Sequence, residues 1–295
     1  MAGASVVFPG PVSPELTLAP LRRGGTDPCF RADGPVIWRT SLMASGAVTA
    51  RIVKSAPDTV DCEVWGAGAA EFLDGLPALL GADDDLMGFA PLEPTIAEAY
   101  RRVPHLRLGR TGRVLEALIP AIIEQRVSGM DAWRAWRSLV TRFGAPAPGP
   151  APAGMRVPPG ADGWRRIPSW EFIRANVDPG RARTIVGCAQ RADALERCRT
   201  AGALRSLPGV GEWTAAETVQ RAFGDADALS VGDYHLSTMV GRTLLGRPID
   251  DAEMLEVLEP LRPHRQRAVR LLEASGLARN PRFGSRSAIP NLRAL

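Results

Sequence analysis

Residues 207–216 read LPGVGEWTAA, and an aspartate, Asp233, follows in the segment VGDYH at 231–235. Gly209 and Gly211 can adopt backbone angles that are closed to other residues, which predicts a tight turn. Apolar residues then recur at helical spacing up to Phe223. The free N–H groups at the start of such a helix favour an anion such as a phosphate. The stretch therefore predicts two helices joined by a hairpin near 203–223, with Asp233 as a separate chemical element.

Two further motifs stand in a fixed order around the hairpin. LIPAIIEQRVS occupies residues 118–128 and LRPHR occupies 261–265. Together with LPGVG and the later aspartate, they resemble the helix-hairpin-helix DNA glycosylase superfamily. The match is most similar to the bacterial 3-methyladenine DNA glycosylases of the broad-specificity alkylation-repair type. It covers roughly residues 90–275.

The expected fold is mainly α. The resemblance implies a bipartite helical glycosylase domain at 89–275, preceded by a small antiparallel α+β domain at 1–88. Strand-forming residue types between Cys29 and Trp65, with turn residues between the runs, indicate a strand meander in the smaller domain. Residues 1–25 are rich in Pro and Gly and are expected to be partly irregular. The Pro/Ala/Gly-rich segment 144–163 predicts an extended linker, and 276–295 a flexible basic tail.

Composition restricts the partners and the compartment. The formal net charge is +4 and the sequence pI is about 9.2, which suits a polyanionic partner without requiring one. The chain contains no C-x-x-C motif and no cysteine after Cys198, so neither a zinc site nor the iron–sulfur cluster of some relatives is expected. It also has no signal peptide and no 18-residue apolar run. We expect a cytoplasmic protein whose partner is double-stranded DNA with damaged bases, with no membrane and no obligate protein partner.

Asp233 is the candidate catalytic residue. Breaking an N-glycosidic bond develops positive charge on the sugar, and a carboxylate stabilises that charge and can orient or deprotonate the attacking water. From the local sequence alone, a cap of the helix that follows is the favoured interpretation of Asp233. The hairpin and the flanking motifs favour catalysis.

The resemblance also implies a base pocket formed by Trp213, Glu217, Leu261 and His264. Relatives that cut the DNA backbone carry an attacking lysine where Trp213 stands, and the one lysine of this chain is Lys54. The protein should therefore be monofunctional. Glu217, Leu261 and His264 replace aromatic residues of relatives, so the pocket offers fewer stacking faces. A core tryptophan is the alternative interpretation of Trp213.

The remaining site residues concern the DNA backbone. Gly209, Val210 and Gly211 would hold a phosphate through their amides, with Thr214 adding a hydroxyl contact or capping the helix. The resemblance places a wedge at Arg126, which is otherwise a surface arginine, and gives Gln125 a minor-groove or structural contact. It also implies a monovalent cation on the hairpin carbonyls, with no metal held by side chains and no other cofactor.

The sequence thus predicts a monofunctional DNA glycosylase that excises alkylated purines resembling 3-methyladenine. The alternative is a non-catalytic helix-hairpin-helix protein that binds DNA or senses damage. The retained Asp233 favours the enzyme, whereas the missing pocket aromatics favour the sensor.

Overall fold

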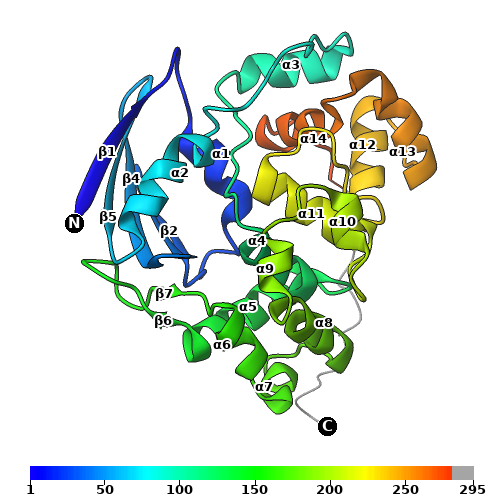
Figure 1. Ribbon diagram of the computed structural model, residues 1–295. Coiled ribbons are helices and arrows are strands. Elements are labelled where there is room, and N and C mark those ends of the chain that lie inside the picture. Colours follow the sequence, from blue (N-terminus) through cyan, green and yellow to red (C-terminus); the bar gives the residue numbers. More distant parts are fainter. Residues whose placement is uncertain (281–295) are drawn as a thin grey trace.

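The computed structural model describes residues 1–280 and consists of an antiparallel sheet beside a larger helical body (Figure 1). The sheet has five strands in the order β1-β5-β4-β3-β2, all antiparallel. Their bounds are β1 Ala2–Val7, β2 Phe30–Asp33, β3 Val36–Met43, β4 Gly46–Ala56 and β5 Thr59–Trp65. The meander expected between Cys29 and Trp65 is confirmed.

One face of the sheet carries the core of this part. Along β5, Val60, Cys62 and Val64 are buried while the residues between them are partly exposed, as period-two alternation requires. Helix α2 (Ala69–Leu79) packs on β1, β4 and β5, and buries Phe72 and Leu76 in the same apolar cluster. The sheet therefore has its own hydrophobic core.

The N-terminal segment is partly irregular, as expected, since residues 8–13 and 22–25 form no helix or strand. It also contains a strand that the sequence did not predict, because β1 pairs with β5 from Ala2 to Val7. Helix α1 (Pro14–Leu18) follows with Ser13 as its N-cap, and a 3-10 turn, η1 (Ala19–Leu21), extends it. The first strand was missed because its apolar residues are few and its pairing partner lies far along the chain.

The helical body contains helices from Pro94 onward. They are α3 (Pro94–Arg102), α4 (Val114–Glu124), α5 (Gly129–Phe143), α6 (Ala161–Arg166), α7 (Ser169–Arg174), α8 (Pro179–Ala189), α9 (Ala192–Leu195), α10 (Ala201–Arg205), α11 (Glu212–Phe223), α12 (Leu236–Leu244), α13 (Asp251–Leu258) and α14 (Arg265–Ala274), with a 3-10 turn η2 (Glu259–Leu261) before α14. The expected helix at 212–223 is confirmed.

This body is bipartite, since its apolar side chains form separate cores. The larger core joins α4, α5, α8 and α11, and includes the fully buried Leu118 and Ile122. Two smaller cores join α12 with α13, and α3 with α14. The two halves meet along the segment between α11 and α12, which carries Asp233.

The segment 144–163 is not an extended linker. Strands β6 (Ala145–Pro146) and β7 (Arg156–Val157) pair with each other, and β7 contacts β3 and β4. The amide of Arg156 donates to the Pro28 carbonyl (2.8 Å), and the Thr40 hydroxyl donates to the Arg156 carbonyl (2.5 Å). The composition of segment 144–163 predicts an extended linker, but these contacts hold the segment between the sheet and the helical body.

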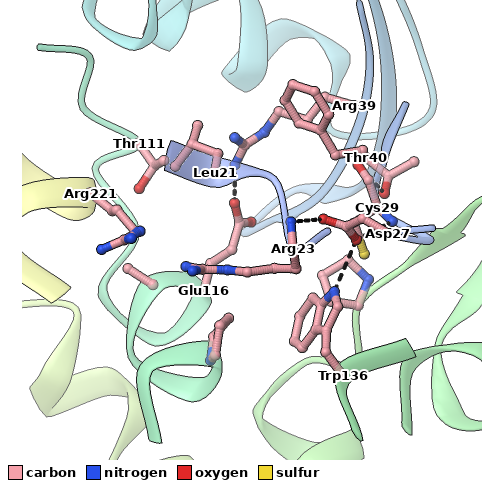
Figure 2. A pocket seen from close by; sticks show the side chains of 14 residues that line it. Leu21, Arg23, Asp27, Cys29, Arg39, Thr40, Thr111, Glu116, Trp136 and Arg221 are labelled. Atoms are coloured by element: carbon pink, nitrogen blue, oxygen red, sulfur yellow. Dashed lines mark hydrogen bonds and ion pairs between the residues drawn. The ribbon is translucent and has the colours of Figure 1, made fainter. Parts of the chain in front are cut away.

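A buried junction ties the N-terminal segment to the helical body (Figure 2). The Asp27 carboxylate accepts hydrogen bonds from the amides of Arg23 (2.7 Å) and Cys29 (2.9 Å) and from Trp136 Nε1 (2.9 Å). Burial raises the pKa of Asp27, and these three donors oppose that rise. Because this junction fixes Arg23, the N-terminal segment helps to shape the cleft described next.

Most of the predicted basic tail, from residue 281 onward, lies outside the described residues. Within residues 1–280, no helix combines the length and apolarity needed to cross a membrane.

Candidate active site

A large open cleft of about 1330 Å³ lies where the two halves of the helical body meet. Its walls come from η1 and the residues after it, the end of α4, α11, the 230–236 segment and α14. Asp233, Trp213, Glu217 and Arg126 all line it. The structure thus brings together predicted site residues from two distant parts of the sequence, one at Arg126 and the other between Trp213 and Asp233.

Asp233 makes two kinds of contact from the wall of this cleft. Its Oδ2 accepts a hydrogen bond from Trp213 Nε1 (3.1 Å), while its Oδ1 accepts from the amides of His235 (2.8 Å) and Leu236 (3.0 Å). The carboxylate therefore caps α12 and also faces Trp213. The capping and catalytic interpretations of Asp233 are therefore compatible, because Oδ1 accepts from the amides at the start of α12 while Oδ2 faces Trp213.

The backbone before Asp233 is held in place. Gly232 has a φ of 85°, a left-handed conformation that favours glycine. Its amide donates to Asp251 Oδ2 at the start of α13 (2.9 Å). These contacts fix the direction in which the Asp233 side chain leaves the main chain.

The hairpin between α10 and α11 has the predicted form. Gly209 has a φ of 83° and lies against Thr184, so that an added Cβ would stand 2.1 Å from Thr184 Oγ1. Gly211 is the N-cap of α11 with a φ of −87°, and no atom lies within 4 Å of the place a Cβ would take. No side chain caps α11, so the N–H groups of its first turn are open to an external acceptor.

Two of the predicted backbone contacts are internal instead. The Val210 side chain is buried, and its amide donates to the Leu207 carbonyl (3.1 Å). Thr214 is only 2% exposed and accepts a hydrogen bond from Gln125 Nε2 (2.8 Å). Gln125 Nε2 also donates to the Gly209 carbonyl (2.9 Å). Of the two roles expected for Gln125, its contacts fit the structural one, because they link the end of α4 to the hairpin.

Arg126, the predicted wedge, projects from the cleft wall in a strained conformation. It is exposed and has a φ of 58°, which is uncommon for a residue other than glycine. Such strain persists only where the surroundings impose it, and it concentrates at functional sites.

The floor of the cleft is charged. Arg23 and Glu124 form an ion pair (3.0 Å), and Arg221 pairs with Glu217 (2.7 Å), which also accepts from the Ser230 hydroxyl. Burial would raise the pKa of Glu217, but Arg221, the Ser230 hydrogen bond and Arg23 outweigh it and hold that pKa below its ordinary value. Glu217, which replaces an aromatic residue of relatives, is therefore an ionised hydrogen-bond acceptor in the cleft.

No family model matches the sequence. A curated relative, the probable bifunctional transcriptional activator/DNA repair enzyme AlkA of Mycobacterium tuberculosis, is 30% identical over 159 residues. That alignment covers 49% of this chain and 30% of the relative, so the chain spans less than a third of the relative's length.

The solved structures decide the fold. The 3-methyladenine DNA glycosylase of Archaeoglobus fulgidus is similar with a TM-score of 0.75 and 17% identity, covering 92% of this chain and 98% of that one. The 8-oxoguanine glycosylase/lyase of Clostridium acetobutylicum is similar with a TM-score of 0.70 and 12% identity, covering 92% and 96%. This chain has the fold of the helix-hairpin-helix DNA glycosylases. The sequence relative, AlkA, agrees with the resemblance to the 3-methyladenine type.

Within this glycosylase fold, two predicted pocket residues lie away from the cleft. His264 is 4% exposed, with Nε2 beside the Met87 carbonyl (3.0 Å) and its ring edge-on to Phe89. Leu261 packs in the apolar clusters of α12, α13 and α3. The turn before α14 directs both residues toward the segment near Met87, so neither forms the pocket.

Other residues of the cleft were not predicted from sequence. Arg23 enters from the N-terminal segment, and Gln266 and Arg270 enter from α14. Trp133 and Tyr234 add aromatic rings that are 39% and 56% exposed. The spacing of apolar residues in α14 predicts a helix, but it does not show which side of that helix lines a cleft.

The side chains offer no evident metal centre. Across residues 1–280, no group of three or more His, Cys, Asp or Glu side chains stands close enough to hold a metal ion. The cysteines are free, and burial raises the pKa of Cys62 to about 12 and that of Cys188 to about 11. These two thiols are therefore protonated at neutral pH.

Proposed function

We propose that this protein is a DNA glycosylase that hydrolyses the N-glycosidic bond of a damaged base in double-stranded DNA. The observation that carries the proposal is the placement of Asp233. Its Oδ2 is held 3.1 Å from Trp213 Nε1 in a cleft that also contains the open N-terminus of α11. The likeness in fold to DNA glycosylases supports the proposal.

The geometry supports the following mechanism. The hairpin holds the backbone through the first turn of α11, and the damaged nucleotide rotates out of the stack into the cleft. Arg126 fills the gap that it leaves, where a guanidinium can stack on the neighbouring bases. The Asp233 carboxylate then stabilises the positive charge that develops on the sugar and orients water toward it.

The resemblance implies a monovalent cation on the hairpin carbonyls, and two carbonyls of the hairpin also accept hydrogen bonds within the protein. The Gly209 carbonyl already accepts from Gln125 (2.9 Å) and the Leu207 carbonyl from Val210 (3.1 Å). No step of the proposed reaction uses a cation.

We propose that the enzyme is monofunctional, because Trp213 stands where a lyase needs an attacking amine. Lys54 lies in β4, on the sheet and outside the residues that line the cleft. Wild-type protein incubated with alkylated duplex DNA should release methylated base and leave abasic sites without nicks. Borohydride should trap no covalent protein–DNA adduct. A trapped adduct would show that an amine of this chain reaches the sugar.

We further propose that the substrates are alkylated purines, preferentially positively charged ones such as 3-methyladenine. The Archaeoglobus neighbour supports this class by its name, and the AlkA relative is named a DNA repair enzyme. The cleft supports it through the Trp213 ring and the carboxylate of Asp233, which attract a cationic base. Neutral lesions such as hypoxanthine and 8-oxoguanine should be poor substrates.

Trp213→Ala tests this pocket, with His264→Ala as the matched control. Trp213→Ala should reduce release of 3-methyladenine at least ten-fold, since it removes both a ring face and the hydrogen bond to Asp233. His264→Ala should leave the ratio of 3-methyladenine to 8-oxoguanine release unchanged, because His264 lies outside the cleft. The measurement is base release by chromatography from duplexes carrying each lesion. Efficient excision of 8-oxoguanine would contradict the proposed substrate class.

A damage-sensing protein without activity is the second candidate, favoured by the charged floor of the cleft. The same base-release measurement separates the two. A sensor would bind lesion-containing duplex more tightly than undamaged duplex and release no base.

A further inference from the structure

A second groove, of about 440 Å³, adjoins the hairpin. One wall is the exposed side of α8, and the other is the hairpin turn at residues 207–209. Gly209 lines both this groove and the large cleft. The two hollows therefore meet at the turn that precedes α11.

The groove is cationic and free of carboxylates. Arg183 and Arg191 line it together with the Thr184 hydroxyl, and no Asp or Glu is among the residues that form it. Both arginines are exposed. The Arg191 guanidinium donates a hydrogen bond to the Gly187 carbonyl in α8 (3.0 Å).

These arginines differ from most of those around the cleft. Arg23, Arg221 and Arg270 line the cleft, and each is paired with a carboxylate at 3.0 Å or less. In the part of the chain that the structure describes, neither Arg183 nor Arg191 takes part in an ion pair. An unpaired guanidinium is available to an external anion without first breaking an internal pair, and it binds phosphate oxygens through two parallel N–H groups.

We propose that this groove carries the DNA strand onward from the hairpin, so that Arg183 and Arg191 bind the phosphates that follow the one held at the start of α11, all on one side of the flipped nucleotide. The inference rests on the proposed function, which places that nucleotide in the cleft and the next phosphate at the start of α11. Continuity supports it, because Gly209 borders both hollows. The small residues Gly180 and Gly187 in the groove leave room for a sugar–phosphate backbone.

The test compares two double variants that lose the same charge. One is Arg183→Gln with Arg191→Gln. The control is Arg31→Gln with Arg166→Gln, two exposed arginines in β2 and α6 that line neither hollow. Affinity for an undamaged duplex is measured by fluorescence anisotropy across a series of salt concentrations. The groove variant should reduce the slope of log K against log[salt] by about two, since each phosphate contact contributes about 0.9. The control should keep the wild-type slope.

Shortening a duplex that carries one abasic site locates the contact, because the site fixes the position of the flipped nucleotide. With the arm on one side of the site removed beyond the first phosphate, wild type and groove variant should bind alike, whereas removal of the other arm should preserve their difference. Equal slopes for the groove and control variants, or a difference between wild type and groove variant that survives removal of either arm, would overturn the proposal. Base release by the wild type is scored separately. If the wild type releases no base but the groove variant shows the expected smaller slope, the proposed glycosylase activity is wrong and the proposed groove stands. If the wild type releases base but the groove variant keeps the wild-type slope, the activity stands and the groove is wrong.

Discussion

Asp233→Asn should lower the rate of base release by a factor of about 10² to 10³ or more, the range found when preorganised electrostatic stabilisation is removed from an active site. The substitution removes the negative charge that faces the sugar and keeps the shape of the side chain. Single-turnover release of methylated base from alkylated duplex DNA measures the effect.

The hydrogen bonds around Asp233 explain why folding should survive. An asparagine Oδ1 still accepts from the amides of His235 and Leu236, and asparagine is as good a helix cap as aspartate. The Nδ2 group would then face Trp213 Nε1, a donor, so the contact at 3.1 Å is lost. One lost hydrogen bond costs about 1 kcal/mol, which leaves a folded protein.

Asp225→Asn is the matched control. Asp225 lies in the same connection between α11 and α12, and its Oδ1 likewise accepts from two backbone amides, those of Asp227 (2.9 Å) and Ala228 (3.0 Å). It is not among the residues that line the cleft. The control should release base at the wild-type rate, and both variants should bind undamaged duplex normally. Release by Asp233→Asn within a few-fold of wild type would remove Asp233 from the catalytic role.

The hairpin and its helix could be predicted from sequence because their determinants are local. The positive φ of Gly209 and the spacing of apolar residues up to Phe223 are properties of neighbouring residues. Asp233 follows on the same stretch of chain. Its hydrogen bond to Trp213 joins two residues only twenty positions apart, so one sequence motif can contain both partners.

The rest of the cleft could not be predicted, because its walls are made by long-range packing. Arg23 reaches the floor through the Asp27 junction with Trp136, more than a hundred residues away in sequence. Thr214 resembles an exposed cap in sequence, yet Gln125 covers it. His264 was placed in the pocket by its motif, whereas its ring turns toward Met87. In each case a partner distant in sequence decides the direction of the side chain.

The two hairpin glycines, which sequence alone treats as equivalent, should respond differently to substitution by valine. Gly209→Val should destabilise the protein, since a β-branched residue at a φ of 83° is strained and its Cβ would stand 2.1 Å from Thr184 Oγ1. The strain alone amounts to about 1–3 kcal/mol, and the clash adds to it. A marked loss of thermal stability is the expected result.

Gly211→Val should leave folding nearly intact and weaken DNA binding at least ten-fold. Its φ of −87° suits any residue, and no atom lies within 4 Å of the added Cβ, so the fold does not require glycine there. The loss of a preferred cap residue costs no more than about 1 kcal/mol. An isopropyl group at the open start of α11 would instead hold a phosphate away from the free amides, for every DNA sequence alike, because the contact is to the backbone. Thermal unfolding and anisotropy with undamaged duplex separate the two variants. A folded Gly211→Val protein with wild-type affinity would show that the hairpin does not grip the phosphate.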